Sequence, residues 1–415
     1  MRSLFTHSSQ KAARRKSRLS ALATVLMVAA SAVALAATPS AAAGPAPADP
    51  GPNDDSFYTP PSPLPAGAPG DVIRWRPSPA PQFTGTVNSW QVMYLSADED
   101  GAPNAVTGTI LVPKTANPAT APIVSFASGT HGGAFRCAPS SMLAVGAGYE
   151  RPAIADMLKA GYAVVMTDYA GYHVKPKTTY ITGLSEGRAV IDMVRAGQKL
   201  PAAKLSTTAP VFFRGYSQGG GAALWAGQLQ PEYGQDVKLA GVVAGGVPGD
   251  LVQVTLKLDG SRGFGFLLYA LVGLNNAYPE INLASYLNDA GRAAVADVEN
   301  EACTLELVVK YKNKALSEFT TDTPVQEALL AAVAKNKLGT MPVKVPVLQY
   351  HGSNDDIVAF GQADTLHKTY CRAGVNLTWK TYPTDHITGI FDGNADAMTF
   401  LKDRVAGTPA TPNCP

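Results

Sequence analysis

One pentapeptide of the 415-residue sequence could carry nucleophilic chemistry: Gly215-Tyr216-Ser217-Gln218-Gly219, which matches the pattern G-x-S-x-G. It follows the apolar segment 211–214 and precedes a helix-like segment, 221–229, which is the context that the motif requires. The glycines remove side chains that would collide with neighbouring elements, because such a turn forces its serine into a strained backbone conformation. Ser217 is therefore the predicted nucleophile, and a purely structural glycine-rich turn is the alternative.

A serine hydroxyl is too weak an acid to attack unaided, so a histidine must accept its proton and a carboxylate must orient that histidine. With this motif the three residues follow one another in the order Ser, Asp, His. The loop 351–358 comes after the apolar segment 345–350 and supplies Asp355 as the predicted acid, with Asp356 as its rival. The loop after the next predicted strand supplies His386 as the predicted base.

Position in the sequence eliminates the other five histidines as the base. His7 belongs to the N-terminal leader, and His367 falls within the predicted helix 361–370. The remaining three precede the serine or lie at the wrong strand end: His131, His173 and His351. Asp385, next to His386, is assigned to shaping its loop, because consecutive side chains diverge.

Negative charge that develops on the substrate oxygen needs two backbone N–H donors, an oxyanion hole. The residue after the nucleophile, Gln218, is the first predicted donor. The second is expected in the loop after an early strand, within 125–133, where Thr130 or His131 would supply it.

Short apolar, β-branched runs predict the strands that would hold these residues, at 107–112, 122–127, 162–166, 211–214, 239–243, 345–350 and 377–382. Helical spacing of apolar residues lies between several of them, as at 149–160 and 182–196. The alternation favours an α/β fold in which a mostly parallel central sheet carries helices on both faces.

The segment 251–338 interrupts this alternation, because it has several helical patterns and few strand-like runs. Its apolar residues between Phe264 and Val272 are unusually dense. Inserted between two strands, the segment predicts a helical cap (a lid) over the strands' carboxyl ends, where open α/β sheets bind ligands. The plainer interpretation is a helical layer packed on the core, which is predicted to comprise 71–250 and 339–415.

The first 43 residues predict a secretory signal peptide and hence an extracellular protein. A basic stretch that includes Arg14 and Arg15 runs into the apolar segment 21–36, and small residues follow with cleavage sites ending at Ala36 and Ala43. An uncleaved membrane anchor is the alternative, and the paired arginines are a weak sign of twin-arginine export. Residues 44–70, rich in Pro, Gly and Ala, predict a linker or a clamped N-terminal arm.

The composition of the mature chain excludes several classes of partner. Removal of residues 1–43, which hold six basic side chains and no acidic one, changes the formal charge from +2 to −4 and leaves no basic block for nucleic acid.

The remaining cysteines, Cys137, Cys303, Cys371 and Cys414, are even in number and indicate disulfides, with three possible pairings. No C-x-x-C motif and no histidine cluster is present, so we expect no metal site and no cofactor.

Several motifs together resemble the secretory lipase family. They are Gly129-Thr130 followed by Cys137-Ala138-Pro139-Ser140, the turn Gly215–Gly219, the segment Tyr350–Val358, and Asp385-His386-Ile387-Thr388. The resemblance extends over essentially the whole mature chain. One departure is the glycine-rich stretch 129–136, where the fungal members carry an acidic residue.

This resemblance implies an α/β-hydrolase core with a helical cap and hydrolysis of carboxylic esters of lipids. It implies Ser217, Asp355 and His386 as the catalytic triad, with Thr130 in the oxyanion loop. It also implies that Cys137 pairs with Cys303 and that Cys371 pairs with Cys414.

We therefore predict a secreted serine hydrolase, a lipase or esterase, that acts on lipid or other small esters, including esters at a lipid–water interface. The mature form is expected to have no membrane span. A peptidase or acyltransferase with the same triad is one alternative, since the chemistry up to the acyl-enzyme is shared. A binding protein on an inactive hydrolase scaffold is another, and the complete Ser, Asp and His set argues against it.

Overall fold

The computed structural model of the chain describes residues 49–414, so the predicted leader at 1–43 lies outside the described residues. The strands are β1 (Asp49–Pro50), β2 (Val72–Pro77), β3 (Val87–Ala97), β4 (Pro103–Pro113), β5 (Ile123–Ala127), β6 (Ala163–Ala170), β7 (Val211–Tyr216), β8 (Leu239–Gly245), β9 (Val347–Gly352) and β10 (Leu377–Tyr382). The α-helices are α1 (Pro139–Ala144), α2 (Arg151–Lys159), α3 (Gly183–Lys199), α4 (Gln218–Tyr233), α5 (Leu251–Leu258), α6 (Phe264–Ala277), α7 (Asp289–Asn300), α8 (Thr304–Tyr311), α9 (Glu327–Lys335), α10 (Phe360–Arg372), α11 (His386–Asp392) and α12 (Asn394–Val405). None of these helices is both long and apolar enough to cross a membrane.

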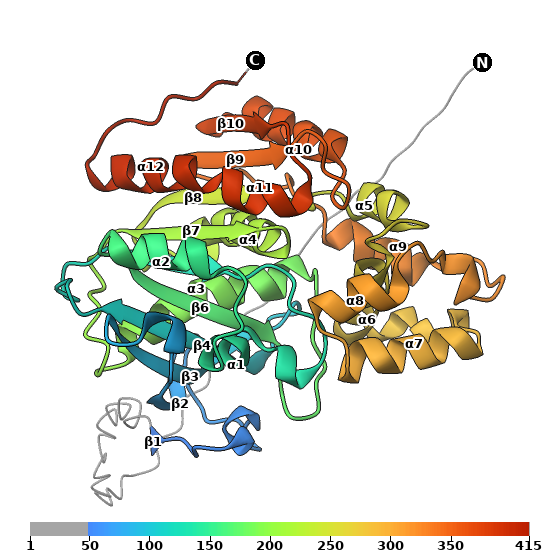
Figure 1. The fold of residues 1–415 in the computed structure, drawn as a ribbon, viewed down its shortest axis with the longest axis horizontal. Coiled ribbons are helices and arrows are strands. Elements are labelled where there is room, and N and C mark those ends of the chain that lie inside the picture. The colour runs from blue at the N-terminus through green and yellow to red at the C-terminus, as the bar shows by residue number, and fades with distance from the viewer. Residues whose placement is uncertain (1–48, 415) are drawn as a thin grey trace, which may run out of the picture. The chain divides into compact units, whose positions relative to one another are not determined.

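The strands form one sheet in the order β1-β2-β3-β4-β6-β5-β7-β8-β9-β10. From β6 to β10 every pair of neighbours is parallel, whereas β2, β3, β4 and β6 pair antiparallel. The carboxyl ends of the parallel strands therefore meet at one edge of the sheet (Figure 1). The predicted α/β fold with a mostly parallel sheet is confirmed.

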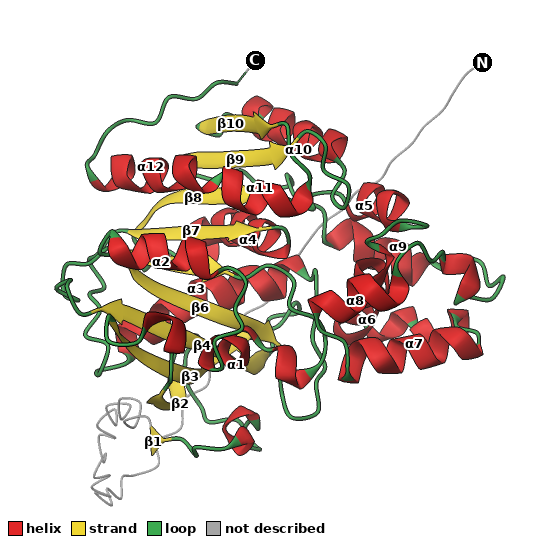
Figure 2. Cartoon of the chain, in the orientation of Figure 1, coloured by secondary structure: helices red, strands yellow, loops and turns green. Residues whose placement is uncertain are grey.

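Helices cover both faces of the sheet, because side chains alternate between the faces along each strand. In β7, Val211 and Phe213 belong to the hydrophobic core formed with α3 and α4, while Phe212 belongs to the core formed with α2 and α12. Figure 2 shows these two helical layers with the sheet between them. The central strands are thus buried on both sides, which explains their nearly continuous apolar sequences.

Three strands, β1, β2 and β3, do not follow from the sequence pattern. In β3, Gln91 and Ser96 interrupt the apolar run, although both side chains are buried. Each is hydrogen-bonded: Gln91 Nε2 donates to the Tyr58 hydroxyl at 2.8 Å, and Ser96 Oγ donates to Asp192 Oδ2 at 2.7 Å. A buried polar side chain with its partner in place is compatible with a central strand, but the partner cannot be identified from the local sequence.

The described part of the N-terminal arm, residues 49–70, packs on the core. β1 pairs with β2, and the rings of Phe57 and Tyr58 are 0% and 1% exposed. The Tyr58 hydroxyl also lies 2.8 Å from Ser140 Oγ, at the start of α1. The overall composition of 44–70 gives no sign of this packing, because the buried rings stand within a segment rich in Pro, Gly and Ala.

The segment between β8 and β9 contains α5 to α9 and no β-strand (residues 246–346). These helices, called the cap below, have a hydrophobic core of their own, which includes Phe264, Leu268 and Val298. Ile357 and Val358, from the loop after β9, complete this core. Figure 1 shows the helices gathered beyond the carboxyl ends of the parallel strands.

Because Phe57 is fully buried, we predict that Phe57→Ala lowers the free energy of unfolding by about 3–5 kcal/mol. Urea unfolding of the purified protein measures this value. Val145→Ala, at a side chain that is 74% exposed, is the matched control and should change stability by less than about 0.5 kcal/mol. Equal effects of the two substitutions would mean that the arm is not part of the folded unit.

Candidate active site

Ser217 occupies a strained turn between β7 and α4, with φ 58° and ψ −123°. A Cβ atom at Gly215 would lie 2.2 Å from the carbonyl oxygen of Gly219, and one at Gly219 would lie 1.9 Å from the carbonyl oxygen of Ala127. Only glycine fits at either position, which is the steric reason for the G-x-S-x-G pattern. The helix α4 begins directly at Gln218, three residues earlier than the predicted helical segment.

The structure brings Ser217, His386 and Asp355 together at the carboxyl edge of the sheet. His386 Nε2 lies 2.9 Å from Ser217 Oγ, and His386 Nδ1 lies 2.6 Å from Asp355 Oδ2. A neutral imidazole with its proton on Nδ1 donates to the carboxylate and accepts from the serine hydroxyl. These are the two contacts that proton transfer from the serine requires.

His386 is the first residue of α11, whereas the sequence predicts a loop at this position. Asp385 explains the difference, because its carboxylate caps the helix by accepting from the Thr388 backbone N–H at 2.8 Å. The Tyr216 hydroxyl donates to the His386 carbonyl oxygen at 2.7 Å. The imidazole is thus held by a helix cap and by the residue next to the serine.

Asp355 is surrounded by hydrogen-bond donors. Its Oδ1 accepts from the backbone N–H groups of Ile357 at 2.9 Å and Val358 at 2.7 Å. Its Oδ2 faces both His386 and the buried His351, whose Nε2 lies 3.2 Å away and 2.9 Å from the Val358 carbonyl oxygen. Burial alone would raise the pKa of Asp355, but the hydrogen bonds from His351 and His386 outweigh it and hold that pKa well below its usual value.

Asp356, the rival acid, faces away from the imidazole ring. Its Oδ1 accepts from Arg262 Nη2 at 3.1 Å, and its second oxygen forms an ion pair with Nε of the same guanidinium group. The contact of Asp356 with His386 is made by the backbone N–H of His386, which lies 3.4 Å from Asp356 Oδ1. Since Arg262 lies between α5 and α6, Asp356 connects the cap to the acid loop.

His131, a candidate for the second oxyanion donor, does not line the cavity above the serine. Its Nδ1 lies 2.9 Å from the Gly129 carbonyl oxygen, its ring stacks on Tyr149, and burial lowers its pKa to about 4. Thr130 and Gln218 both line the cavity, next to Ser217. Of the two candidates for the second donor, Thr130 is the one that faces the substrate space.

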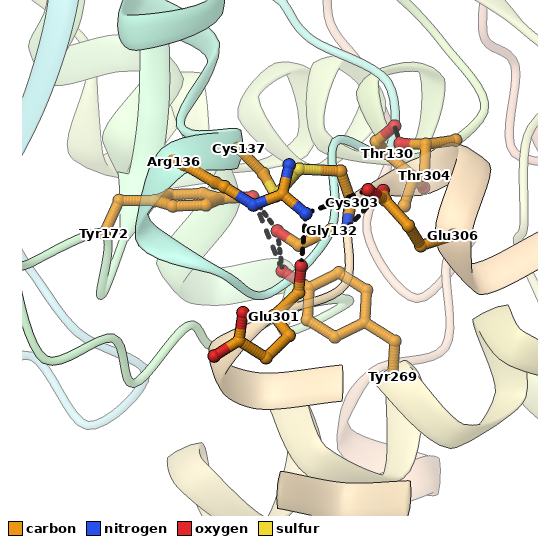
Figure 3. Close-up of a disulfide and its surroundings, with 10 residues drawn as sticks. All are labelled: Thr130, Gly132, Arg136, Cys137, Tyr172, Tyr269, Glu301, Cys303, Thr304 and Glu306. Atoms are coloured by element: carbon orange, nitrogen blue, oxygen red, sulfur yellow. Dashed lines mark hydrogen bonds and ion pairs between the residues drawn. A yellow bond between two sulfur atoms is a disulfide. The ribbon is translucent and has the colours of Figure 1, made fainter. Parts of the chain in front are cut away.

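The structure pairs Cys137 with Cys303 and Cys371 with Cys414, the pairing that the family resemblance implied. The first disulfide joins the loop after β5 to the residue that precedes α8 (Figure 3). Around it, Thr304 N donates to the His131 carbonyl oxygen at 2.9 Å and Thr304 Oγ1 donates to the Thr130 carbonyl oxygen at 2.5 Å. The start of α8 is therefore fastened directly to the predicted oxyanion loop.

A cavity of about 700 Å³ lies above Ser217 and His386. Its walls are largely apolar and come from the cap helices α5, α6, α8 and α9 and from α11. Several apolar lining residues are about half exposed or more: Val252, Leu256, Leu305, Val325, Leu330, Ile387 and Phe391. The serine thus lies beneath an apolar space with an apolar rim.

Three residues around the site have no motif that would have identified them. The sequence indicates only that Glu186 lies at the start of a predicted helix, and not that its carboxyl group accepts from Gln218. Arg262 and Thr304 belong to the cap, where no residue pattern indicates a contact with the core. The neighbour of Thr304, Cys303, is the one available sign, through the implied disulfide with Cys137.

No group of three or more His, Cys, Asp or Glu side chains within residues 49–414 has the arrangement of a metal site. A strained serine after a central parallel strand, with an imidazole and a carboxylate from the next strand ends, defines a serine hydrolase of the α/β-hydrolase class.

Comparisons with known proteins lead to the particular family. The model of the secretory lipase family matches residues 137–413. Lipase 6 of Candida albicans is 30% identical over 397 residues, which cover 88% of this chain and 83% of that lipase. A secreted triacylglycerol lipase of Malassezia furfur is 28% identical, over 87% of this chain and 78% of its own.

Among solved structures, lipase A of Candida antarctica in its closed state matches with a TM-score of 0.79 and 26% identity, over 88% of this chain and 89% of that chain. The chain belongs to the secretory lipase family. It is a serine carboxylic ester hydrolase, as the sequence predicts.

Because the Cys137–Cys303 disulfide fastens α8 to the loop that holds Thr130, we predict that Cys137→Ser/Cys303→Ser lowers both stability and kcat. The stability loss should be about 2–4 kcal/mol, and chemical unfolding together with an ester assay measures both quantities. Cys371→Ser/Cys414→Ser is the matched control, because that disulfide lies away from the cavity-lining residues. It should lower stability and leave kcat nearly unchanged in the folded fraction, so a comparable loss of kcat in the control would contradict the coupling.

Proposed function

We propose that Ser217, His386 and Asp355 catalyse ester hydrolysis through an acyl-enzyme intermediate. The observation that carries this proposal is the unbroken chain of hydrogen bonds from Ser217 Oγ through His386 to Asp355. It lies at the floor of a largely apolar cavity, where an ester carbonyl would meet the serine and an acyl chain would leave water.

In the acylation step, Ser217 Oγ bonds to the carbonyl carbon of the ester and its proton passes to His386 Nε2. The carbonyl oxygen becomes an oxyanion, which the backbone N–H groups of Gln218 and Thr130 are proposed to stabilise. Collapse of the tetrahedral intermediate breaks the ester C–O bond, and His386 gives its proton to the departing alcohol. Water then attacks the acyl-enzyme by the same route in reverse and releases the carboxylic acid and free Ser217.

We further propose that the substrates are lipid esters with long acyl chains, such as triacylglycerols, and that the mature enzyme acts outside the cell. The size and apolar lining of the cavity support the first point, and the Malassezia furfur relative is itself named a triacylglycerol lipase. The half-exposed apolar side chains of its rim, among them Leu256 and Phe391, suit contact with a lipid–water interface. The leader-like residues 1–43 support the second point.

The triad assignment predicts that Ser217→Ala and Asp355→Asn each lower kcat/KM for a soluble ester by roughly 10³-fold or more, because they remove the nucleophile and the group that orients its base. Circular dichroism should show an intact fold. Wild type, unlike Ser217→Ala, should be labelled by an organophosphonate probe, which reports an activated serine whatever the substrate.

Asp356→Asn is the control for the acid, since this neighbouring carboxylate faces Arg262 and not the imidazole ring. It should lose less than about tenfold in kcat/KM, as expected for a partly exposed ion pair. If Asp356→Asn were inactive and Asp355→Asn active, the two roles would have to be exchanged. Labelling of Ser217→Ala by the probe would refute the nucleophile.

The apolar cavity predicts that kcat/KM for p-nitrophenyl esters rises with acyl length from butyrate to laurate. Burial of each methylene group contributes up to about 0.8 kcal/mol, or about fourfold. Ala270→Phe, in the cavity wall, should reduce this gain for laurate more than for butyrate. Ala296→Phe, on an exposed position of α7, is the matched control, and an equal effect of the two variants would contradict the proposed acyl site.

A further inference from the structure

Two buried carboxyl groups lie beside the oxyanion candidates and have no part in the triad. The first is Glu186, near the start of α3, which is 2% exposed. Its Oε1 accepts from Gln218 Nε2 at 2.7 Å and from the backbone N–H of Ile181 at 2.9 Å. One carboxyl oxygen therefore joins the first residue of α4 to the loop that precedes α3.

That loop leads to the other side of the oxyanion hole. Ile181 has φ 64°, a conformation that a β-branched side chain rarely adopts, so its N–H contact with Glu186 stabilises an unfavourable backbone. Its neighbour Tyr180 places its hydroxyl 2.8 Å from Thr130 Oγ1. Glu186 thus contacts the residue of one predicted donor directly and is connected to the other through Ile181 and Tyr180.

The second carboxyl group is Glu150, directly before α2, which is 5% exposed. Its Oε1 accepts from the backbone N–H of Gly129 at 2.8 Å. Gly129 immediately precedes Thr130, and Glu150 also lines the cavity above Ser217. The Gly129–Thr130 segment is therefore held by a second carboxyl oxygen at Gly129 as well as by the Tyr180 hydroxyl at Thr130.

We propose that Glu186 and Glu150 are positioning residues of the oxyanion hole and that they act in their neutral, protonated forms. This inference rests on the proposed function, because it concerns the alignment of the Gln218 and Thr130 N–H groups. A protonated carboxyl group still accepts hydrogen bonds through its carbonyl oxygen. It does so without placing a negative charge behind donors that must stabilise an oxyanion.

The surroundings of both groups favour the neutral form. Burial raises the pKa of Glu186 and that of Glu150 to about 8, with their hydrogen bonds acting in the opposite direction. The titratable groups that face Glu186 are Tyr169 of β6, Tyr180 and Tyr269 of α6, none of them cationic. Those that face Glu150 are Tyr149, Tyr169, Tyr350 of β9 and Arg214 of β7, and the charge of Arg214 does not offset the burial.

The sign of the pH effect follows from these directions. Both carboxyl groups are neutral below about pH 8 and become charged above it, so the oxyanion hole loses strength as the pH rises through that range. The pKa of each group is raised by folding, so the associated stability is complete below the usual glutamate pKa and is also lost as the pH rises towards 8. Activity and unfolding must therefore be measured at the same pH values.

The test compares the pH profiles of kcat and KM from pH 6 to 10 for wild type, Glu186→Gln, Glu150→Gln and the double variant, with a soluble p-nitrophenyl ester. Wild-type kcat should fall above about pH 8 by up to about tenfold per pH unit for each ionising group. The fall should be shallower in each single variant and absent below about pH 10 in the double variant. A double variant that declines at the wild-type pH, while thermal scans show it folded, would overturn the proposal.

Glu99→Gln is the matched control, because burial raises the pKa of Glu99 to about 7 although it does not line the cavity. Its profile should coincide with that of wild type, and a shift as large as that of the double variant would contradict a role specific to the oxyanion hole. Glu186→Leu removes the acceptor altogether and should lower kcat by roughly 10- to 100-fold with KM within about twofold. Wild-type kcat in a folded Glu186→Leu would also overturn the proposal.

The result is separable from that of the proposed function. If the triad assignment failed, Ser217→Ala would keep ester hydrolysis and phosphonate labelling, or Asp355→Asn would keep the activity of wild type. If only this inference failed, wild type would be active and labelled, and the glutamine variants would keep its alkaline decline.

Discussion

The close approach of backbone segments around Ser217 is the constraint on which the rest of the site depends. The serine has φ 58°, and the chain on either side passes so near to Ala127 that Gly215 and Gly219 admit no side chain. A Cβ atom at the next residue, Gly220, would lie 2.3 Å from the carbonyl oxygen of Gly245 in β8. The turn is therefore held between β5 and β8, the two strands that neighbour β7. The packing of the sheet offsets the energetic cost of its strained backbone.

From this fixed point, each partner of the serine is held by contacts that reach across chain segments. The imidazole of His386 is positioned by Asp385, which caps the N-terminus of α11, and by the Tyr216 hydroxyl. The carboxylate of Asp355 is positioned by backbone N–H groups of its own loop. The cap is connected to both sides of the site, through Arg262 to the acid loop and through Thr304 and the Cys137–Cys303 disulfide to the loop of Thr130. An ion pair, a hydrogen bond and a disulfide thus join the helical cap to the loops that hold Asp355 and Thr130.

The sequence predicts the parts of this arrangement that local chemistry determines. The G-x-S-x-G turn, the order of Ser217, Asp355 and His386, and the apolar strands between them follow from steric and hydrophobic requirements that are visible within a few residues. Strand β3 and the burial of Phe57 cannot be predicted in this way. Gln91 of β3 is hydrogen-bonded to Tyr58, the neighbour of Phe57, although the two residues lie 33 positions apart. The choice of Thr130 over His131 and the contacts of Glu186 depend likewise on which loops meet in space, and no spacing within the sequence records that.

The groups that surround each buried carboxyl group explain why the pKa values of acids around one apolar site are shifted in opposite directions. Asp355 has four donors, two backbone N–H groups and two imidazoles, and its pKa is held below the usual value in spite of burial. Burial raises the pKa of Glu186 and of Glu150, because their hydrogen bonds come from backbone and amide N–H groups and do not offset it. A charged Asp355 suits stabilisation of the proposed imidazolium, and the raised pKa values of Glu186 and Glu150 support the proposal that these two acids act in the neutral form. Both shifts begin from burial, because an ionised group away from water depends on the donors and charges that neighbouring segments place around it.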